Sequence, residues 1–459
     1  MYHEHLRIID NFSTALRASE DRVRVLEREN AELRAKYQAL HQRQFKTNRK
    51  KGDVGGGQEG SGLSSTGAKP KKLGAPFGHP AWTRPTPTRI DQIVQVLAPS
   101  VCPHCGSKDL TPTETQNEHI QEDIVIKPRT VVTKYVHEEA FCRRCRRSVV
   151  GVGVDEIPHA PIGPTVKSTA SYLRYEIGIS YRKVQRILGD LFGLSCVPAS
   201  VVGFDQRAAK RGEAIYEDIR EKIRVSEVVH ADETSWRNDG KGSFVWFAGN
   251  DKLAFFHIDR HRSADVAKAI FGNDFNGTIV RDRYAAYNGI GGNVQVCLAH
   301  IITNGKDIRR EHELLPKEDQ DAAVFSFLDR VIAICKQACD AGQRLKSGEI
   351  TWNEAAGIEK RFMRKLAAIC KRGQSFKPAE TLRTCLIGPE QRRLFTFLRI
   401  PGIPPTNNHA EQSLRKIAIM RKVCFGSRSD KGIKTHSIIP SLVQTARRQG
   451  VNPREFLHI

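Results

Sequence analysis

Three acidic residues that are far apart in the sequence occupy positions where carboxylates can act together. Asp232 follows one apolar, strand-like segment, Asp282 follows another, and Glu411 lies on the first turn of a predicted helix. Nearby carboxylates repel each other unless a divalent cation is held between them, and Mg²⁺ takes such oxygen ligands. These residue types predict a divalent-metal site, provided that the fold brings them together.

Each acid also has a simpler interpretation. Strand alternation should direct either Asp232 or Glu233 away from a metal. Asp282 could cap the turn that leaves its strand. Asn408 and Glu411 have the spacing of a capping box, which contributes about 1 kcal/mol to a helix without any catalysis. Taken singly, each simpler interpretation is preferable, so a metal site requires elements that carry all three acids to one place.

The order of the predicted elements meets that requirement. It is strand, strand, strand, helix, strand, strand, over residues 227–230, 243–249, 253–258, 263–271, 278–281 and 294–298. This order matches the ribonuclease-H-like fold, in which the first and fourth strands are neighbours. Asp232 and Asp282 are therefore expected to converge, and a third carboxylate, Glu411, is expected from the later helix.

Four cysteines form a second constellation with metal-ligand spacing. Two Cys-x-x-Cys pairs, Cys102 with Cys105 and Cys142 with Cys145, can place four thiolates around one structural Zn²⁺. Segments 122–126 and 131–136 are predicted strands that bring the pairs together. The arginines beside the second pair either contact DNA or offset the thiolate charge; they are Arg143, Arg144, Arg146 and Arg147.

The N-terminal region combines a heptad pattern with a basic segment. Residues 5–40 predict a parallel homodimeric coiled coil with Asn30 at an a position, although one amphipathic helix packed on its own chain is the alternative. Residues 43–89 carry ten Lys and Arg, including Lys50 and Lys51, among many Gly and Pro. Such a segment cannot bury a core; it either follows DNA phosphates or serves as a solvated linker.

A helical segment lies between the cysteines and the predicted sheet. Residues 181–192, a turn at Gly193 and residues 198–209 have helix-turn-helix spacing, and Pro198 suits the first position of the second helix. The functional interpretation is docking in the DNA major groove. The alternative is an ordinary helical hairpin, which this spacing alone does not exclude.

Composition and charge support a nucleic-acid partner. The chain has 459 residues with a net charge of +22, and 39% of its residues are hydrophobic, enough to form cores. Excess Lys and Arg favour double-stranded DNA as partner, because cations release counterions from phosphates. Eleven cysteines, a charged N-terminus and the lack of a long apolar run predict a cytoplasmic protein with no disulfide framework and no membrane association, and a DNA partner would make it nucleoid-associated.

Several motifs, in order along most of the chain, resemble the insertion-sequence sixty-six family of DDE transposases, which carry an N-terminal zinc-binding domain. They are His-Ala-Asp-Glu-Thr at 230–234, Asp-Arg-Tyr-Ala-Ala-Tyr at 282–287, Cys-Leu-Ala-His at 297–300, Asn-Asn-His-Ala-Glu-Gln-Ser-Leu-Arg at 407–415, the two cysteine pairs, and Ser-Leu-Val-Gln-Thr-Ala-Arg-Arg-Gln-Gly at 441–450. After residue 300 this chain reads Ile-Ile-Thr-Asn-Gly-Lys-Asp, where the family more usually continues with basic residues.

The resemblance implies that Asp232, Asp282 and Glu411 are the catalytic acids and hold Mg²⁺ or Mn²⁺. It implies a transposase that binds the ends of an insertion sequence and catalyses strand cleavage and strand transfer, and the element can also encode accessory proteins. The alternative is an inactive, DNA-binding regulator derived from such an enzyme. Cys297 and His300 either support the edge of the active site or are a buried thiol and a core histidine.

Together these observations predict an α/β multidomain protein. The expected domains are a coiled coil (1–46), a basic linker (47–98), a zinc ribbon (99–150), a helix-turn-helix-like region (160–225), a ribonuclease-H-like catalytic core (226–300 and 401–425), a helical insertion between its acids (301–400), and a C-terminal helical extension (426–459).

Overall fold

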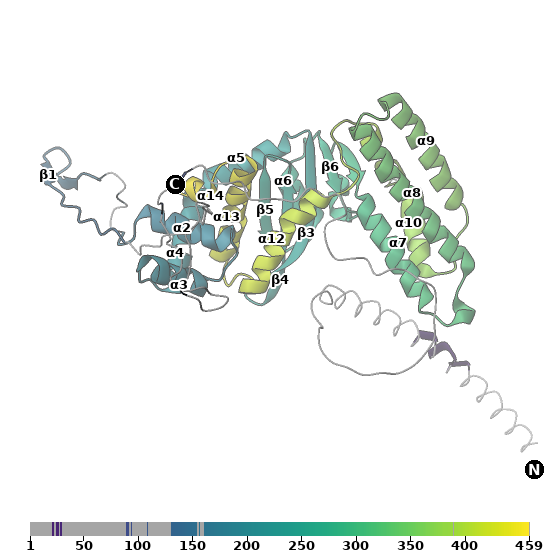
Figure 1. Cartoon of the computed structure of the whole chain (residues 1–459), viewed down its shortest axis with the longest axis horizontal. Coiled ribbons are helices and arrows are strands. Elements are labelled where there is room, and N and C mark those ends of the chain that lie inside the picture. The colour runs from purple at the N-terminus through teal and green to yellow at the C-terminus, as the bar shows by residue number, and fades with distance from the viewer. Residues whose placement is uncertain are drawn as a thin grey trace, which may run out of the picture. The chain divides into compact units, whose positions relative to one another are not determined.

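The computed structural model describes residues 130–153, 156, 160–388 and 390–458, together with the isolated residues 21, 22, 24–26, 28, 29, 89, 90, 93 and 108. The chain divides into two compact units, Met1–Lys50 with Pro128–Ile459, and Lys51–Lys127. Every helix and strand named below belongs to the first unit (Figure 1). Most of the predicted coiled coil lies outside the described residues, as do Lys50, Lys51, Cys102, Cys105 and the predicted strand 122–126.

A mixed five-stranded sheet forms the centre of the fold. Its strands are β3 (Val228–Asn238), β4 (Lys241–Gly249), β5 (Ala254–Asp259), β6 (Thr278–Arg281) and β7 (Asn293–Val296), in the order β5-β4-β3-β6-β7. The pairs β3–β4 and β4–β5 are antiparallel, whereas β3–β6 and β6–β7 are parallel. The first and fourth of these strands along the chain, β3 and β6, are neighbours as expected from the sequence, although β3 continues well beyond Asp232.

Local sequence accounts for the connections in this sheet. Asp239 and Gly240 join β3 to β4 with positive φ angles of 51° and 74°, the two-residue turn that Asp-Gly favours in hairpins. Helix α6 (Ala264–Phe271) makes the crossover from β5 to β6. Between β6 and β7 the chain forms the short 3₁₀ turn η1 (Ala285–Gly289).

The C-terminal helices pack on this sheet. Helix α12 (Asn408–Cys424) contacts β3 and β4, and α13 (Asp430–Arg448) packs along β5 (Figure 1). Ile438, Ile439, Leu442 and Val443 of α13 belong to the same hydrophobic core as the strands. Residues 426–459, which end in the short helix α14 (Pro453–Phe456), are therefore structurally continuous with the sheet domain.

Within residues 160–225, four helices precede the sheet: α2 (Pro164–Tyr175), α3 (Tyr181–Phe192), α4 (Pro198–Arg211) and α5 (Glu213–Arg224). Helix α3 has the bounds predicted from the sequence, and Gly193 ends it in a left-handed conformation at φ 66°. Val184 and Leu188 of α3 pack against Val201 and Phe204 of α4. The predicted helical pair therefore exists and has its own small core.

The segment between β7 and α12 is helical, as expected. It contains α7 (Leu298–Glu313), η2 (Lys317–Asp319), α8 (Ala322–Lys346), α9 (Trp352–Ile369), α10 (Lys377–Ile387), α11 (Glu390–Arg393) and η3 (Thr396–Leu398). Its core includes Val280 of β6 and Val294 and Val296 of β7, so the insertion is packed onto the parallel side of the sheet. No helix in the described part of the chain is long and apolar enough to cross a bilayer.

A two-stranded hairpin lies near the second cysteine pair. It consists of β1 (Glu139–Cys142) and β2 (Arg147–Val150), and the turn between them carries Arg143 to Arg146. The predicted strand 131–136 is wrong, because those residues form no strand. Alternating apolar residues form a strand only where a neighbouring strand can pair with them. In this region β2 pairs with β1 and not with residues 131–136.

Candidate active site

The geometry of the sheet brings Asp232 and Asp282 together. His230 of β3 pairs with Val280 of β6 in parallel register, and each aspartate lies two residues beyond that pair. Ligand oxygens of Asp232, Asp282 and Glu233 all lie within 4.8 Å of one another. The convergence predicted from the strand order is confirmed, and Glu233 joins it.

The expectation that Asp232 or Glu233 would be directed away from the cluster is wrong. Asp232 Oδ1 accepts a hydrogen bond from the backbone N–H of Glu233 at 2.8 Å, which keeps this carboxylate close to its own strand. The longer Glu233 side chain is only 2% exposed and reaches the same region. Alternation along a strand fixes the direction of Cβ, but local hydrogen bonds and side-chain length decide where the carboxylate ends.

Glu233 is held by partners that the sequence did not indicate. Arg262 donates from Nε to Glu233 Oε1 at 3.0 Å, and the hydroxyl of Tyr287 donates to Oε2 at 2.7 Å. The guanidinium of Arg262 also lies over the ring of Tyr284, 3.9 Å from its centroid. Glu233 is therefore a buried carboxylate whose two oxygens already accept hydrogen bonds. It adds negative charge beside Asp232 and Asp282.

Asp282 caps its turn and belongs to the cluster at the same time. Its Oδ1 accepts from the backbone N–H of Tyr284 at 2.8 Å, as the simpler interpretation expected. The buried Arg281 donates to the backbone carbonyl of Asp282 at 2.6 Å and to Asn288 Oδ1 at 2.9 Å, which fixes the chain after β6. A carboxylate has two oxygens, so the turn and a metal do not exclude each other.

The electrostatics of the cluster favour a bound cation. Burial, together with the negative charge of Glu233, raises the pKa of Asp232 to about 7. Burial also raises the pKa of Glu233, although Tyr287 and Arg262 oppose the shift. Carboxylate oxygens alone suit Mg²⁺ or Mn²⁺, and a divalent cation relieves the repulsion that raises these pKa values. The residues therefore fit the metal that the sequence predicts.

Glu411 stands on the first turn of α12 but outside the cluster of ligand oxygens formed by Asp232, Glu233 and Asp282. Its Oε1 lies 3.7 Å from Nδ1 of His300, and both side chains are 40% exposed. The pKa of His300 is raised to about 9 by the neighbouring Cys297 side chain and by the charges of Glu411 and Asp232, against the effect of burial. The raised pKa favours the protonated form of His300, whose half-exposed side chain lies beside Glu411.

The capping-box interpretation of Glu411 is wrong. The N-cap of α12 is Asn407, not Asn408, and its side chain makes no cap hydrogen bond. Instead, Asn407 is fully buried and binds the neighbouring strand. Asn407 Nδ2 donates to the carbonyl of Ala231 at 2.8 Å, and its Oδ1 accepts from His230 Nδ1 at 2.9 Å. The start of α12 is therefore attached to β3 immediately before Asp232.

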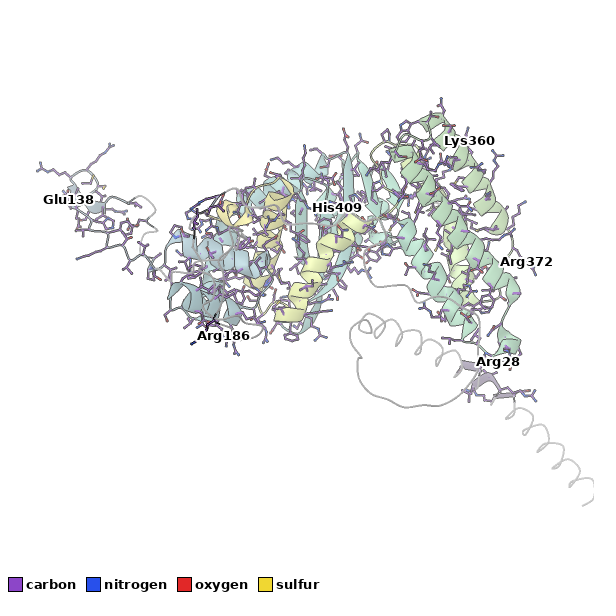
Figure 2. The ribbon with its side chains drawn as sticks, in the orientation of Figure 1. Arg28, Glu138, Arg186, Lys360, Arg372 and His409 are labelled. Atoms are coloured by element: carbon purple, nitrogen blue, oxygen red, sulfur yellow. The ribbon has the colours of Figure 1, made fainter. Side chains whose placement is uncertain are left out.

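A second histidine at this end of α12, His409, has a lowered pKa, in contrast to His300. His409, at the end of α12 that meets the sheet (Figure 2), lies with its ring 4.6 Å from that of His230. Burial and the nearby Arg448 lower the pKa of His409 to about 4, so it is neutral at pH 7. The motif positions 230, 407 and 409 thus serve the packing that places Asp232 and Glu411.

The second cysteine pair lies on the hairpin turn. Cys142 ends β1 and Cys145 lies in the exposed turn, and the pKa of Cys142 is lowered by hydrogen bonds from Cys145 and Arg144. Both thiols are free of disulfides. Arg143, Arg144, Arg146 and Arg147 are all exposed, so their side chains are accessible to a polyanion.

Comparison with known proteins gives one family. Residues 159–435, more than half of the 459 residues, match the family model described as Transposase IS66 family. The curated proteins contain no match to the chain.

Proposed function

The chain belongs to the transposase IS66 family, and from this premise we propose that it binds the ends of an insertion sequence and catalyses metal-dependent strand cleavage and strand transfer. In this proposal Asp232, Asp282 and Glu411 are the catalytic acids and hold Mg²⁺ or Mn²⁺. The observation that carries it is the convergence of Asp232 and Asp282 at matching positions on two parallel neighbouring strands.

We propose that the sheet domain is a ribonuclease-H-like core. The strand order β5-β4-β3-β6-β7 supports this, because three antiparallel strands are followed by two parallel ones that extend the other side of the sheet. The first acid then comes from the central strand, the second from its parallel neighbour, and the third from a helix after the insertion. The fold alone does not imply catalysis, so the proposal depends on the acids themselves.

In this proposal Glu411 completes the site by a change of side-chain conformation. Asn407 fixes the backbone of α12 against β3, so only the half-exposed Glu411 side chain has to turn from His300 toward the aspartates. When bound, the cations supply positive charge to the oxygens that attack and leave the phosphorus. Arg262 and Tyr287 keep Glu233 paired, which leaves Asp232 and Asp282 as the ligands on the strands.

DNA and self-association follow as further parts of the proposal. The arginine-bearing hairpin, α3 with Arg186 (Figure 2) and the basic segment 43–89 offer cations to double-stranded DNA, and Zn²⁺ at Cys102, Cys105, Cys142 and Cys145 would fix the hairpin. Leu26, at a predicted d position, is helical and 50% exposed in the single chain, which leaves it available to a second chain. A dimer through residues 5–40 would hold two element ends together.

The alternative function, an inactive DNA-binding regulator, is not favoured. A protein that only binds DNA has no need of three carboxylates, two on β3 and one just after β6, that converge beside each other, because repulsion among them destabilises the metal-free fold. Such a regulator would tolerate neutral residues at positions 232, 282 and 411. This difference gives the experiment.

The test measures cleavage of a labelled duplex carrying the element's terminal inverted repeat, in Mg²⁺, with the full chain. Asp232→Asn, Asp282→Asn and Glu411→Gln are each expected to abolish cleavage and strand transfer while leaving duplex binding nearly intact. Asp265→Asn, an exposed acid on α6, is the matched control and should cleave like the wild type. A Glu411→Gln variant that cleaves at the wild-type rate would remove Glu411 from the site, and unchanged cleavage by all three would overturn the proposal.

A further inference from the structure

A second group of metal-ligating side chains lies beside the carboxylate cluster and differs from it in chemistry. Ligand atoms of Cys297, His300 and Glu411 all lie within 4.8 Å of one another. We propose that these three residues form a separate site for Zn²⁺, and that Zn²⁺ bound there withholds Glu411 from Asp232 and Asp282. The site itself rests on geometry alone, whereas its effect on Glu411 rests on the function proposed above.

Two helix starts carry the three ligands. Cys297 is the N-cap of α7 and His300 is on its first turn, a Cys-x-x-His spacing that places both on one helix face. Glu411 is on the first turn of α12. Two hydrogen bonds from backbone N–H groups join the helix starts. The Asn407 N–H donates to Cys297 Sγ at 3.1 Å, and the Leu298 N–H donates to the carbonyl of Pro405 at 3.0 Å. The ligands are therefore held in place from both sides.

The distances and the donors fit a tetrahedral ion. The separation of 3.7 Å between His300 Nδ1 and Glu411 Oε1 is close to the ~3.4 Å expected for two ligands each about 2.0–2.1 Å from a tetrahedral Zn²⁺. Within the described part of the chain, the buried Nδ1 of His300 has no hydrogen-bond partner, so it has an unsatisfied lone pair or proton at this point. Cys297 is fully buried, and its Sγ accepts a hydrogen bond from the Asn407 N–H.

Ligand type separates this site from the carboxylate cluster. Thiolate and imidazole donors suit Zn²⁺ and disfavour Mg²⁺, whereas carboxylate oxygens alone suit Mg²⁺ or Mn²⁺. Glu411 belongs to the second group, and His300 links the two groups, since it interacts with Glu411 and with Asp232. Three protein ligands leave a fourth position open, unlike the closed four-cysteine site predicted at the hairpin. Zn²⁺ and the catalytic cation would therefore compete for Glu411.

The binding test counts metal on the full chain and does not depend on cleavage. After chelation and dialysis against Zn²⁺, the wild type is expected to retain one more zinc per chain than Cys297→Ser, because serine still accepts from the Asn407 N–H but is a poor zinc ligand. Cys370→Ser, another buried free thiol, is the matched control and should retain the wild-type count. With Co²⁺ in place of Zn²⁺, the wild type should gain thiolate-to-metal absorption that Cys297→Ser lacks.

A second variant keeps the test decisive if Cys297→Ser does not fold. The His300 side chain is 40% exposed, so His300→Gln should fold and should also lose one zinc. Equal zinc counts and equal Co²⁺ spectra for the wild type and both variants would overturn the site. The competition is tested separately, by titrating Zn²⁺ into the Mg²⁺ cleavage assay: Cys297→Ser should need at least tenfold more Zn²⁺ than the wild type for half-inhibition. Zinc that binds through Cys297 without inhibiting cleavage would overturn Glu411 as the shared ligand.

Discussion

Asn407 and His230, 177 residues apart in the chain, are joined by a hydrogen bond of 2.9 Å between Asn407 Oδ1 and His230 Nδ1. The same amide donates to the carbonyl of Ala231, the residue before Asp232. One buried side chain thereby links the helix that carries Glu411 to the strand that carries Asp232. The relative position of two acids thus depends on a residue that would hold no metal itself.

We predict that Asn407→Ala both destabilises the protein and impairs cleavage. The change leaves the Ala231 carbonyl and His230 Nδ1 buried without partners, which should cost about 2–4 kcal/mol of unfolding free energy. Chemical denaturation gives the stability and the labelled-duplex assay gives the cleavage rate. The neighbouring Asn408 is exposed, so Asn408→Ala should change the stability by less than about 0.5 kcal/mol. Equal effects of the two substitutions would show that the link at Asn407 is unimportant.

We predict that Asp232→Asn stabilises the metal-free protein at pH 8 but not at pH 4. Because the pKa of Asp232 is raised to about 7 from 3.8, the folded state keeps a proton that the unfolded state releases. Stability from this group is fully present below pH ~4 and is lost as pH rises through ~7. The variant should therefore gain about 1–3 kcal/mol over the wild type at pH 8 in a chelator, as measured by denaturation.

The control for that experiment is to add the metal ion in place of the chelator. Mg²⁺ or Mn²⁺ binds the ionised carboxylate, so it should stabilise the wild type at pH 8 and leave Asp232→Asn almost unchanged. Asp265→Asn should follow the wild type throughout. A pH-independent difference between Asp232→Asn and the wild type would mean that the pKa of Asp232 is the same in the folded and unfolded states.

We predict that the hairpin cysteines hold structural zinc. Cys142→Ser should lose one zinc per chain and the ordered hairpin with it, because a Zn²⁺ with four thiolate ligands contributes its binding energy to local folding. Metal analysis of the purified chain provides the count, and limited proteolysis near the turn reports the fold. Cys196→Ser, a half-buried free thiol outside both cysteine pairs, should keep the full count. A full count in Cys142→Ser would place the metal elsewhere.

We predict that the basic segment contributes to DNA affinity by neutralising phosphates. Replacing residues 43–89 by a neutral Gly/Ser linker of equal length removes ten Lys and Arg, including Lys50 and Lys51. The slope of log K against log salt should become shallower by about 0.9 for every phosphate that the altered chain no longer neutralises. Binding measured between low and physiological salt gives the slope. If the slope does not change, the segment is a spacer.

Sequence reasoning succeeded where the pattern was local or topological. Residues 278–281 are a strand and residues 181–192 a helix with the predicted bounds, because apolar periodicity and the Gly193 cap fix them. The strand order of the sheet then placed Asp232 beside Asp282. It failed at 131–136, where an alternating pattern found no partner strand in the described part of the chain.

The polar contacts of the site were beyond prediction for a different reason. The ion pair of Glu233 with Arg262 and the bonds of Asn407 to β3 join residues that are 29 and 176 or more positions apart. No periodicity encodes such contacts. The only signal was that His230 and Asn407 stand inside the motifs that also hold Asp232 and Glu411. Likewise, the spacing of Asn408 and Glu411 suggested a cap, but tertiary contacts moved the helix start to Asn407.

The hydroxyl groups of α13 close one edge of the sheet. The backbone N–H groups of Ala254, Phe256 and Ile258 on β5 donate to Thr445 Oγ1, Ser441 Oγ and Ser437 Oγ at 3.0, 2.8 and 3.1 Å. The three hydroxyl groups are four residues apart along α13, and the three N–H groups are two residues apart along β5. Each N–H on this edge of the sheet therefore meets one hydroxyl. An edge strand with such partners cannot template pairing with another chain.

This closure sets a time window during protein synthesis. The strand leaves the ribosome 179 to 191 residues before the hydroxyl groups that cover it. At about 5–20 residues per second, β5 is therefore exposed for roughly 10–40 s on every nascent chain. Polysomes that carry several copies place such open edges side by side. A message truncated before codon 437 would yield chains whose edge is never covered, and these chains would depend on chaperones to stay out of aggregates.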